Sequence, residues 1–218
     1  MMKMTDSKIK ENPRFNYQAN FGKANPLYHN LALYEAGVDE FSQKEYEFAS
    51  LNDILKNAGF AKSTFYYQFG DKLGLYLAII DIIYQKKRAF YELRLKDVKQ
   101  DDDFFSTIKS ISKDTMDFMF IDKRLYYFSN KTMLAGKELM NIIMKYFKYD
   151  SNLLFGSLIE IAQQNKQISR RYSVAFVTNL LKVLFTNIDQ LVNEKTADEA
   201  YESLNLVFDV LENGIKEK

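Results

Sequence analysis

The chain has 218 residues, of which 47% are hydrophobic, 15% are aromatic and none is cysteine, and its formal net charge is +1. This length allows one large or two small packed domains, and the absence of cysteine excludes disulfide bonds and thiolate metal sites and suits a cytoplasmic protein. Only two prolines and eight glycines are present, no alternating apolar pattern is flanked by hairpin turns, and no apolar run could span a membrane, so the sequence predicts an all-α protein without a transmembrane helix.

Residues 1–24 read as a polar N-terminal arm, and they lack the apolar core of a signal peptide. They hold five basic and two acidic side chains, a net charge of +3. One interpretation is a basic tail that adds contacts to phosphates, as the arms of other DNA-binding domains do. The other, which we prefer from the sequence, is a solvated and mobile terminus.

The first predicted helix begins at Asn25-Pro26, where a capping residue precedes a proline in the first turn, and it runs to about Phe41. Gly37 lies inside it, where the missing side chain lowers helix stability but lets another element pack closely. The only histidine, His29, stands near the start of this helix, and we predict a surface position and no catalytic role for it. The apolar residues that would supply a small core are Leu27, Leu31, Leu33, Tyr34, Val38 and Phe41.

Residues 50–72 are the most informative segment of the chain. Ser50 can cap a short helix with Asp53 three residues on, and Gly59 can end that helix in the left-handed conformation. A second short helix follows and ends at Gly70, after which Asp71 can cap a third. Two helices around a short glycine turn form the helix-turn-helix that reads the DNA major groove.

The second of these helices has an apolar back, Phe65 and Phe69, and a polar front. A hairpin that merely packs would explain the back but not the front, whose ammonium and hydroxyl groups suit phosphates and base edges. The overall charge is low for a DNA-binding protein, but residues 56–72 carry three lysines against one aspartate, a local net charge of +2. The acidic residues of the first helix and the turn after it can face away from DNA. The polar front comprises Lys62, Ser63, Thr64, Tyr66, Tyr67, Gln68 and Lys72.

This segment closely resembles the tetracycline-repressor (TetR) family of transcription regulators. The family's pattern is Ala-Gly-aliphatic, a polar pair, Thr-aromatic-Tyr-x-x-Phe and a later Lys. It is matched here by Ala58-Gly59-Phe60, with an aromatic side chain at the aliphatic position, and by Lys62-Ser63, TFYYQF at 64–69 and Lys72. The resemblance extends to residues 31–41 and 73–84, and the rest of the chain fits the family in length and helical character. The departures are Ala61 where the family caps the helix with Ser or Thr, Glu45 in place of a glycine, and Leu73-Gly74 in place of an acidic pair.

The resemblance implies a DNA-binding homodimer whose recognition helices enter successive major grooves of a roughly palindromic operator. We assign Lys62 and Gln68 to base edges or nearby phosphates, and Ser63 is small enough to allow close approach to the groove. The side chains that the family's pattern implies for holding the DNA backbone are Thr64, Tyr66, Tyr67 and Lys72.

A long helix over about residues 72–96 is predicted to link the reading head to the rest of the chain, and in this family it is the element through which ligand binding moves the head. Residues 104–149 are dense in aromatic side chains and methionine, which suit a cavity for an apolar ligand and, equally, an ordinary core. The helices expected in the middle of the chain cover about 103–120, 123–134, 136–149 and 151–166. The candidate pocket residues are Met116, Met119, Phe120, Tyr127, Met144 and Phe147.

The last two predicted helices, about 171–193 and 197–216, are apolar around more of their circumference than one core would use. We expect the same pair from a second subunit to cover them in a four-helix bundle, as TetR-like proteins dimerise. The alternative is that neighbouring helices of the same chain cover them.

The sequence therefore predicts a polar arm at 1–24, a three-helix DNA-binding domain at 25–72 and a helical ligand-binding and dimerisation domain at 73–218. The resemblance implies transcriptional regulation through operator DNA, by repression that a small apolar or aromatic ligand relieves. The alternative is a dimeric helical protein with a DNA-binding head that acts mainly through a protein partner, without a small-molecule inducer. No phosphate loop, Ser/His/Asp set or metal-ligand cluster is evident, so we predict neither an enzyme nor a cofactor or metal site.

Overall fold

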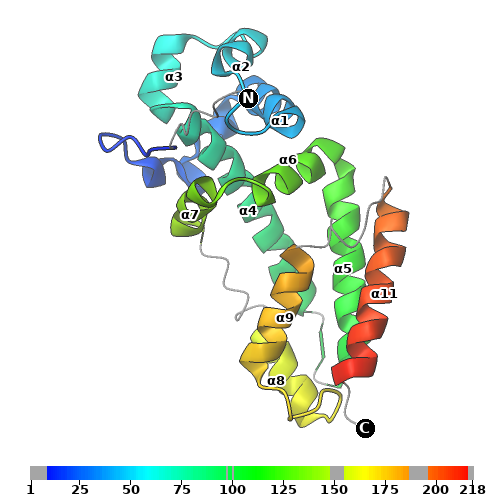
Figure 1. Cartoon of the computed structure of the whole chain (residues 1–218). Helices are drawn as coiled ribbons and strands as arrows, with labels where there is room; N and C mark the ends of the chain where they lie inside the picture. The colour runs from blue at the N-terminus through cyan, green and yellow to red at the C-terminus, as the bar shows by residue number, and fades with distance from the viewer. Residues whose placement is uncertain (1–8, 97, 100, 148–154, 187–195, 216–218) are drawn as a thin grey trace, which may run out of the picture. The chain divides into compact units, whose positions relative to one another are not determined.

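Every regular element in the described part of the chain is a helix, which confirms the prediction of an all-α protein (Figure 1). None of these helices combines the length and the apolar composition that crossing a membrane needs. The computed structural model describes residues 9–96, 98–99, 101–147, 155–186 and 196–215.

Contacts divide the chain into two compact units, and the first comprises Met1–Lys87 and Arg124–Lys148. Its N-terminal part, residues 9–24, is folded onto the unit, which corrects the preferred interpretation of a solvated arm for these residues. The reason is aromatic burial, because Tyr17 is only 2% exposed and Phe21 packs against Phe147 with ring centroids 5.0 Å apart. Residues 1–8 of the predicted arm lie outside the described residues. The short 3-10 helices of this region are η1 (Tyr17–Asn20), η2 (Gly22–Ala24) and η3 (Pro26–His29).

The first α-helix, α1 (Leu31–Gln43), begins later than the sequence predicts. Asn25 does act as a cap, since its side chain accepts a hydrogen bond from the Leu27 N–H at 3.0 Å, but the helix that it caps is the short η3. Asn30 then leaves the helical backbone, with φ −134° and ψ 61°, and its side chain donates to the Pro26 carbonyl at 2.7 Å. This local bond competes with a continuous helix and separates η3 from α1.

Four helices of the first unit enclose one small core. The Cβ that an alanine would add at Gly37 of α1 would lie 2.7 Å from Ile79 Cδ1, so this glycine does allow the close packing that we expected. The other helices are α2 (Leu51–Asn57), α3 (Lys62–Phe69) and α4 (Lys72–Lys96), of which the last continues into the second unit. The buried residues of this core include Leu33, Val38, Phe41, Ile54, Leu55, Phe65, Phe69, Leu75 and Leu77.

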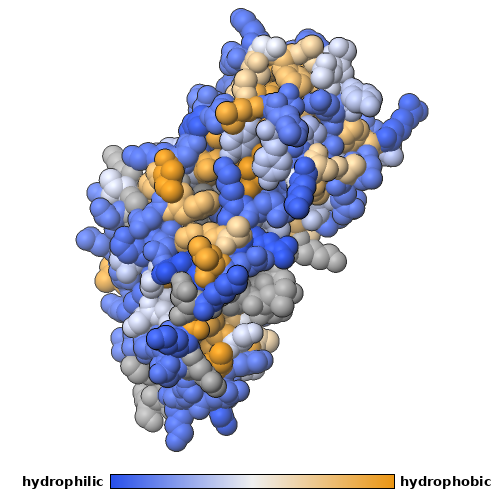
Figure 2. All heavy atoms as spheres, turned by 180° about the vertical axis from the view of Figure 1, so that it is seen from behind, coloured by the Kyte–Doolittle hydropathy of each residue, from blue (hydrophilic) through white to orange (hydrophobic). Residues whose placement is uncertain are grey.

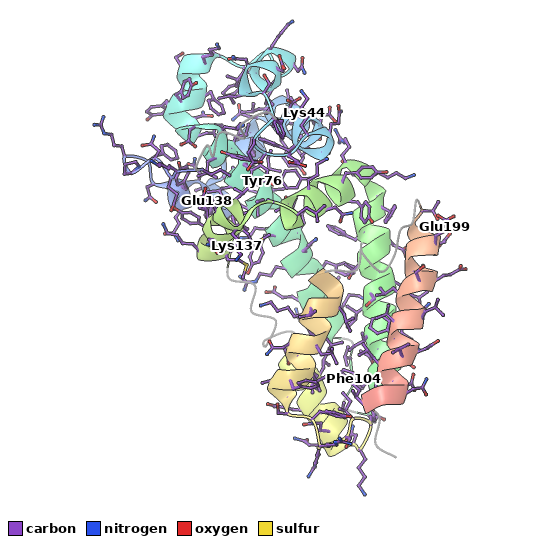
Figure 3. The ribbon with its side chains drawn as sticks, viewed as in Figure 1. Lys44, Tyr76, Phe104, Lys137, Glu138 and Glu199 are labelled. Atoms are coloured by element: carbon purple, nitrogen blue, oxygen red, sulfur yellow. The ribbon has the colours of Figure 1, made fainter. Side chains whose placement is uncertain are left out.

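The same unit includes α6 (Lys123–Met133) and α7 (Lys137–Tyr146). Tyr76 of α4, labelled in Figure 3, packs against Phe41 and Phe128 with ring centroids 4.8 and 5.1 Å away, and its hydroxyl lies 2.7 Å from Thr132 Oγ1 of α6. The helix-turn-helix therefore shares its core with α6. The functional division that we expect at residue 73 stays a prediction, because compact packing continues across it.

The second unit comprises Arg88–Lys123 and Tyr149–Lys218. Its described helices include α5 (Phe104–Ile121), α8 (Ser157–Gln164), α9 (Val174–Thr186) and α11 (Ala197–Ile215). Helices α5 and α11 lie side by side (Figure 1), and Lys109 Nζ is 2.8 Å from Asp209 Oδ1 across that contact. One side of α11 is thus covered by the same chain. The predicted extension of α9 to residue 193 lies outside the described residues. The core of this unit includes Phe104, Phe105, Ile108, Phe155, Ile159, Val177, Leu181, Leu204 and Phe208.

Candidate nucleic-acid interface

Two glycines with positive φ shape the segment from α2 to α4. Ser50 Oγ accepts a hydrogen bond from the Asp53 N–H at 3.2 Å and so caps α2. Gly59, with φ 62°, ends that helix, and Gly70, with φ 75°, ends α3. Ala61 precedes α3 and gives it no side-chain cap. The result is two short helices joined by a tight turn, with α4 beginning directly after them.

Helix α3 has a buried back and an exposed front. Phe65 and Phe69 are both 0% exposed, and their rings stack with centroids 5.4 Å apart. On the front, Tyr66 is 53% exposed and Tyr67 is 87% exposed, so both phenol groups project into solvent. This arrangement leaves hydroxyl and ammonium donors free to meet phosphates and base edges. The other exposed polar residues of α3 are Lys62, Ser63 and Thr64.

Lys72 has a structural role that the sequence does not reveal. Its ammonium donates hydrogen bonds to three backbone carbonyls in the turn between α1 and α2, those of Tyr46 at 2.7 Å, Glu47 at 3.3 Å and Ala49 at 3.0 Å. It also lies over the Tyr46 ring, 4.6 Å from the centroid, and desolvation lowers the pKa of this partly buried amine. The phosphate contact expected of Lys72 stays a prediction, and it would compete with these three carbonyls.

Gln68 also faces the protein more than the pattern suggests. It is half-buried, and its Oε1 atom is enclosed without a hydrogen-bond partner among the described residues. Its backbone carbonyl accepts from Asn20 Nδ2 at 2.5 Å. A base-edge contact through Gln68 therefore stays a prediction, and it requires this side chain to turn outward.

Acidic residues of α1 are matched by cations and amides inside the first unit. Arg124, at the start of α6, donates from its two terminal nitrogens to Glu35 and to Asp39, each at 2.7 Å. Glu40 accepts from Lys44 Nζ at 2.8 Å and from the Ser50 N–H at 2.6 Å. Because these carboxylates already have cationic or amide partners, they oppose the approach of a polyanion less than unpaired ones would.

The N-terminal segment holds the junction of α3 and α4, which sequence reasoning missed. We call residues 9–24 the N-terminal strap. Its Tyr17 hydroxyl donates to Asp71 Oδ2 at 2.7 Å, while Asp71 Oδ1 caps α4 by accepting from the Gly74 N–H at 2.9 Å. The signal that could have found this contact is the group of aromatic residues at positions 15, 17 and 21, which a solvated arm does not need.

The six candidate pocket residues divide between the two compact units. Phe120, with Met116 and Met119 of the same helix, belongs to the second unit, and the other three residues belong to the first. Tyr127 is 50% exposed and Met144 is 42% exposed, whereas Phe147 is buried against Phe21 and Tyr84. A common ligand pocket for these residues stays a prediction.

Helices α9 and α11 each keep an exposed apolar side, as the expected dimer interface requires. Leu206 and Val210 of α11 are 67% and 73% exposed, and Phe176 and Val183 of α9 are 51% and 58% exposed. Figure 2 shows that small groups of apolar residues interrupt the hydrophilic surface elsewhere too, which is usual for a folded chain. What distinguishes α9 and α11 is the helical spacing of these side chains along one element.

The described residues hold no group of three or more histidine or carboxylate side chains placed to bind a metal ion. Residues 33–79 match the family model of the bacterial regulatory proteins of the tetR family. This stretch runs from α1 into α4, so it contains α2, α3 and the turn between them. The search of curated proteins finds no match.

Several solved structures share the fold of most of the chain. A TetR family transcriptional regulator from Chloroflexus aurantiacus is 22% identical with a TM-score of 0.61, over 88% of this chain and 95% of that one. The transcriptional regulator FadR from Bacillus subtilis, solved in complex with stearoyl-CoA, is 17% identical with a TM-score of 0.68, over 85% and 98%. CprB from Streptomyces coelicolor, a TetR family protein solved with its operator sequence, is 16% identical with a TM-score of 0.62, over 87% and 90%.

Proposed function

We propose that this chain, a DNA-binding regulator of the tetR family of bacterial regulatory proteins, acts in the cytoplasm as a homodimeric repressor and not as an enzyme. In this proposal it occupies an operator and leaves it when a small apolar or aromatic ligand binds. The observation that carries the proposal is the division of α3 into an apolar back at 0% exposure and a front of solvent-exposed hydroxyl and ammonium groups. Any surface helix has a polar outer face, but a helix that only packed would have no need of two exposed tyrosines, Tyr66 and Tyr67.

We assign the front of α3 to the major groove. Lys62, exposed in the first turn, is proposed to contact a base edge or a nearby phosphate, and Ser63 allows close approach because its side chain is small. Thr64, Tyr66 and Tyr67 are proposed to hold the DNA backbone through their hydroxyl groups. Contacts to the DNA backbone fix the register of the helix on the duplex without selecting a base sequence.

Two copies of α3 would read one operator. A homodimer formed through α9 and α11 presents both helices to successive major grooves, about 34 Å apart or somewhat more. The exposed apolar side chains of these helices support that mode of pairing, because it would remove them from water. The expected operator is therefore a roughly palindromic pair of half-sites.

A ligand would act by favouring a dimer in which the distance between the two α3 helices no longer matches the distance between successive major grooves. It can shift that equilibrium only by as much as its affinity differs between the two states. The presence of stearoyl-CoA in the B. subtilis FadR structure supports an apolar ligand as the chemical class to test first. The aromatic and methionine-rich stretch from 104 to 149 supports the same class.

Genomic footprinting of the tagged protein, followed by gel shifts on the bound promoters, tests this function. We expect Lys62→Ala to change the order of preference among operator variants, with a loss of about 1–3 kcal/mol at the preferred base. We expect Tyr66→Phe to weaken binding to all sequences similarly, by about 1 kcal/mol, because it removes one hydroxyl donor. Lys86→Ala, at an exposed position further along α4, is the control for loss of positive charge.

If neither Lys62→Ala nor Tyr66→Phe alters the gel shift, α3 is not the recognition helix. If DNA binding is specific but no apolar compound releases it, and a second protein co-purifies, the chain acts through that protein partner instead of a ligand.

A further inference from the structure

The N-terminal strap lies against the C-terminal end of α3 (Figure 1). Asn20 Nδ2 donates to the carbonyl of Gln68 at 2.5 Å, and the Tyr17 hydroxyl donates to Asp71. The ring of Phe15 fills the space beside Gly70, where an added Cβ would come within 2.5 Å of Phe15 Cγ. These contacts fix the position of the strap relative to the helix that is proposed to read DNA.

The other side of the strap is held by α7. The carboxylate of Glu11 accepts hydrogen bonds from Lys145 Nζ, at 3.0 Å, and from the Tyr146 hydroxyl, and the Ile9 N–H donates to Glu138 at 3.1 Å. The bond from Tyr146 is the main cause that lowers the pKa of Glu11, so this carboxylate stays ionised through the neutral range. Figure 3 labels Glu138 on α7 beside the N-terminal segment.

Between these two attachments the chain makes a tight turn at Asn12–Phe15. The Phe15 N–H donates to the Asn12 carbonyl at 3.1 Å, Asn12 Oδ1 accepts from the Arg14 N–H at 3.0 Å, and Pro13 occupies the second position. Asparagine followed by proline is the usual sequence of such a turn. The turn is therefore built by its own residues and anchored on both sides, so little entropy remains to be lost when it binds a partner.

Arg14 follows Pro13 in this turn, and both residues are exposed. It directly precedes Phe15, whose ring touches the end of α3, and it takes part in none of the ion pairs between described residues. A guanidinium is the side chain best suited to grip a phosphate, because its planar donors match two phosphate oxygens at once.

We propose that Arg14 contacts a phosphate of the operator beside the groove that α3 enters, so that each head holds DNA with the strap as well as with the recognition helix. This inference rests on the proposed function, since it needs α3 to face DNA. With this contact, the strap becomes a second DNA-contacting element beside α3, and Arg14 supplies a positive charge that the family pattern of residues 58–72 does not include.

Lys23 offers a matched control within the same strap. It is exposed like Arg14 and carries the same charge. Its neighbour Gly22 donates from its N–H to Asp81 Oδ2 at 2.8 Å. Asp81 lies ten residues beyond Asp71 along α4, which corresponds to about 15 Å of helix, so Lys23 stands well away from the end of α3.

The test measures operator binding as a function of salt concentration for the full chain and for Arg14→Ala, Arg14→Lys and Lys23→Ala. Loss of one phosphate contact per protomer should make the slope of log K against log salt shallower by about 0.9 per protomer, and should lower affinity several-fold for specific and unrelated DNA alike. Arg14→Lys should restore most of the slope, and Lys23→Ala should leave it unchanged. Thermal unfolding checks that Arg14→Ala is folded.

An unchanged slope for Arg14→Ala, or an equal loss for Lys23→Ala, would overturn the inference while the wild-type chain still binds its operator. If the wild-type chain binds no DNA, the proposed function itself fails, so the two failures can be told apart.

Discussion

Gly70 is required both for the backbone turn that ends α3 and for the space that the Phe15 ring occupies. Its backbone adopts φ 75°, a value that residues other than glycine rarely take, and its Cα faces the ring of Phe15. Gly59 has a similar φ of 62°, but no atom lies within 4 Å of where its Cβ would be. Substitution of Gly59 therefore measures backbone strain alone, whereas substitution of Gly70 measures backbone strain together with the cost of displacing the strap.

We expect Gly59→Ala to lower the free energy of unfolding by about 1–2 kcal/mol, the cost of a left-handed alanine. Gly70→Ala should cost about 1–3 kcal/mol more, because the new methyl group overlaps the Phe15 ring. Urea titration of both variants measures the difference. Equal losses for the two variants would mean that Phe15 moves aside freely, and the strap would then not be held at the end of α3.

At the scale of single elements, the turn between α1 and α2 depends on a cation supplied by α4. Three carbonyls of this turn converge on Lys72 Nζ, and removal of the ammonium would leave them without that donor. We expect Lys72→Met, which keeps the apolar stem, to lower the free energy of unfolding by about 2 kcal/mol. Chemical denaturation is the measurement.

The control for Lys72→Met is Lys44→Met, in the same turn. Lys44 pairs with Glu40 one helical turn away, but its side chain is exposed to solvent, so little stability should be lost. If Lys72→Met leaves stability intact and only weakens DNA binding, the main partner of this ammonium is a phosphate and not the turn.

The helix-turn-helix could be predicted because its signals are local. The cap at Ser50, the glycines at 59 and 70 and the spacing of Phe65 and Phe69 each act within a few residues, and the structure has all of them in the expected conformations. The strap could not be predicted in the same way. Its order comes from tertiary contacts with α3, α4 and α7, which no short window of a polar sequence contains.

The same distinction explains the other differences along the chain. Asn30 interrupts the first predicted helix through a hydrogen bond from its side chain to the Pro26 carbonyl. Helix propensity alone does not predict whether such a bond outweighs a continuous helix. Composition indicated a methionine-rich region but not which of its side chains face a common space, since that depends on how helices from different parts of the sequence pack. Lys72 fits a family pattern of DNA contacts, yet its carbonyl partners lie 23 to 26 residues away in sequence.

For the whole molecule, the proposed function requires two chains, and the exposed sides of α9 and α11 are where pairing is expected. We predict that Leu206→Glu combined with Val210→Glu converts the protein to a monomer, because two buried carboxylates per chain cost far more than the lost apolar contact. Sedimentation velocity measures the change of mass. Since an operator with two half-sites is bound cooperatively only by a dimer, the affinity of this variant for the full site should fall to that for a half-site.

Leu31→Glu is the matched control, because Leu31 on α1 is 67% exposed, as Leu206 is, but lies in the other compact unit. It should leave the oligomeric state unchanged, which separates an interface effect from a general effect of replacing an exposed leucine by a charge. A double variant that remains dimeric would show that α11 faces solvent in the assembly. Dimerisation would then have to use another surface, and the spacing of the two recognition helices would have to be derived anew from that surface.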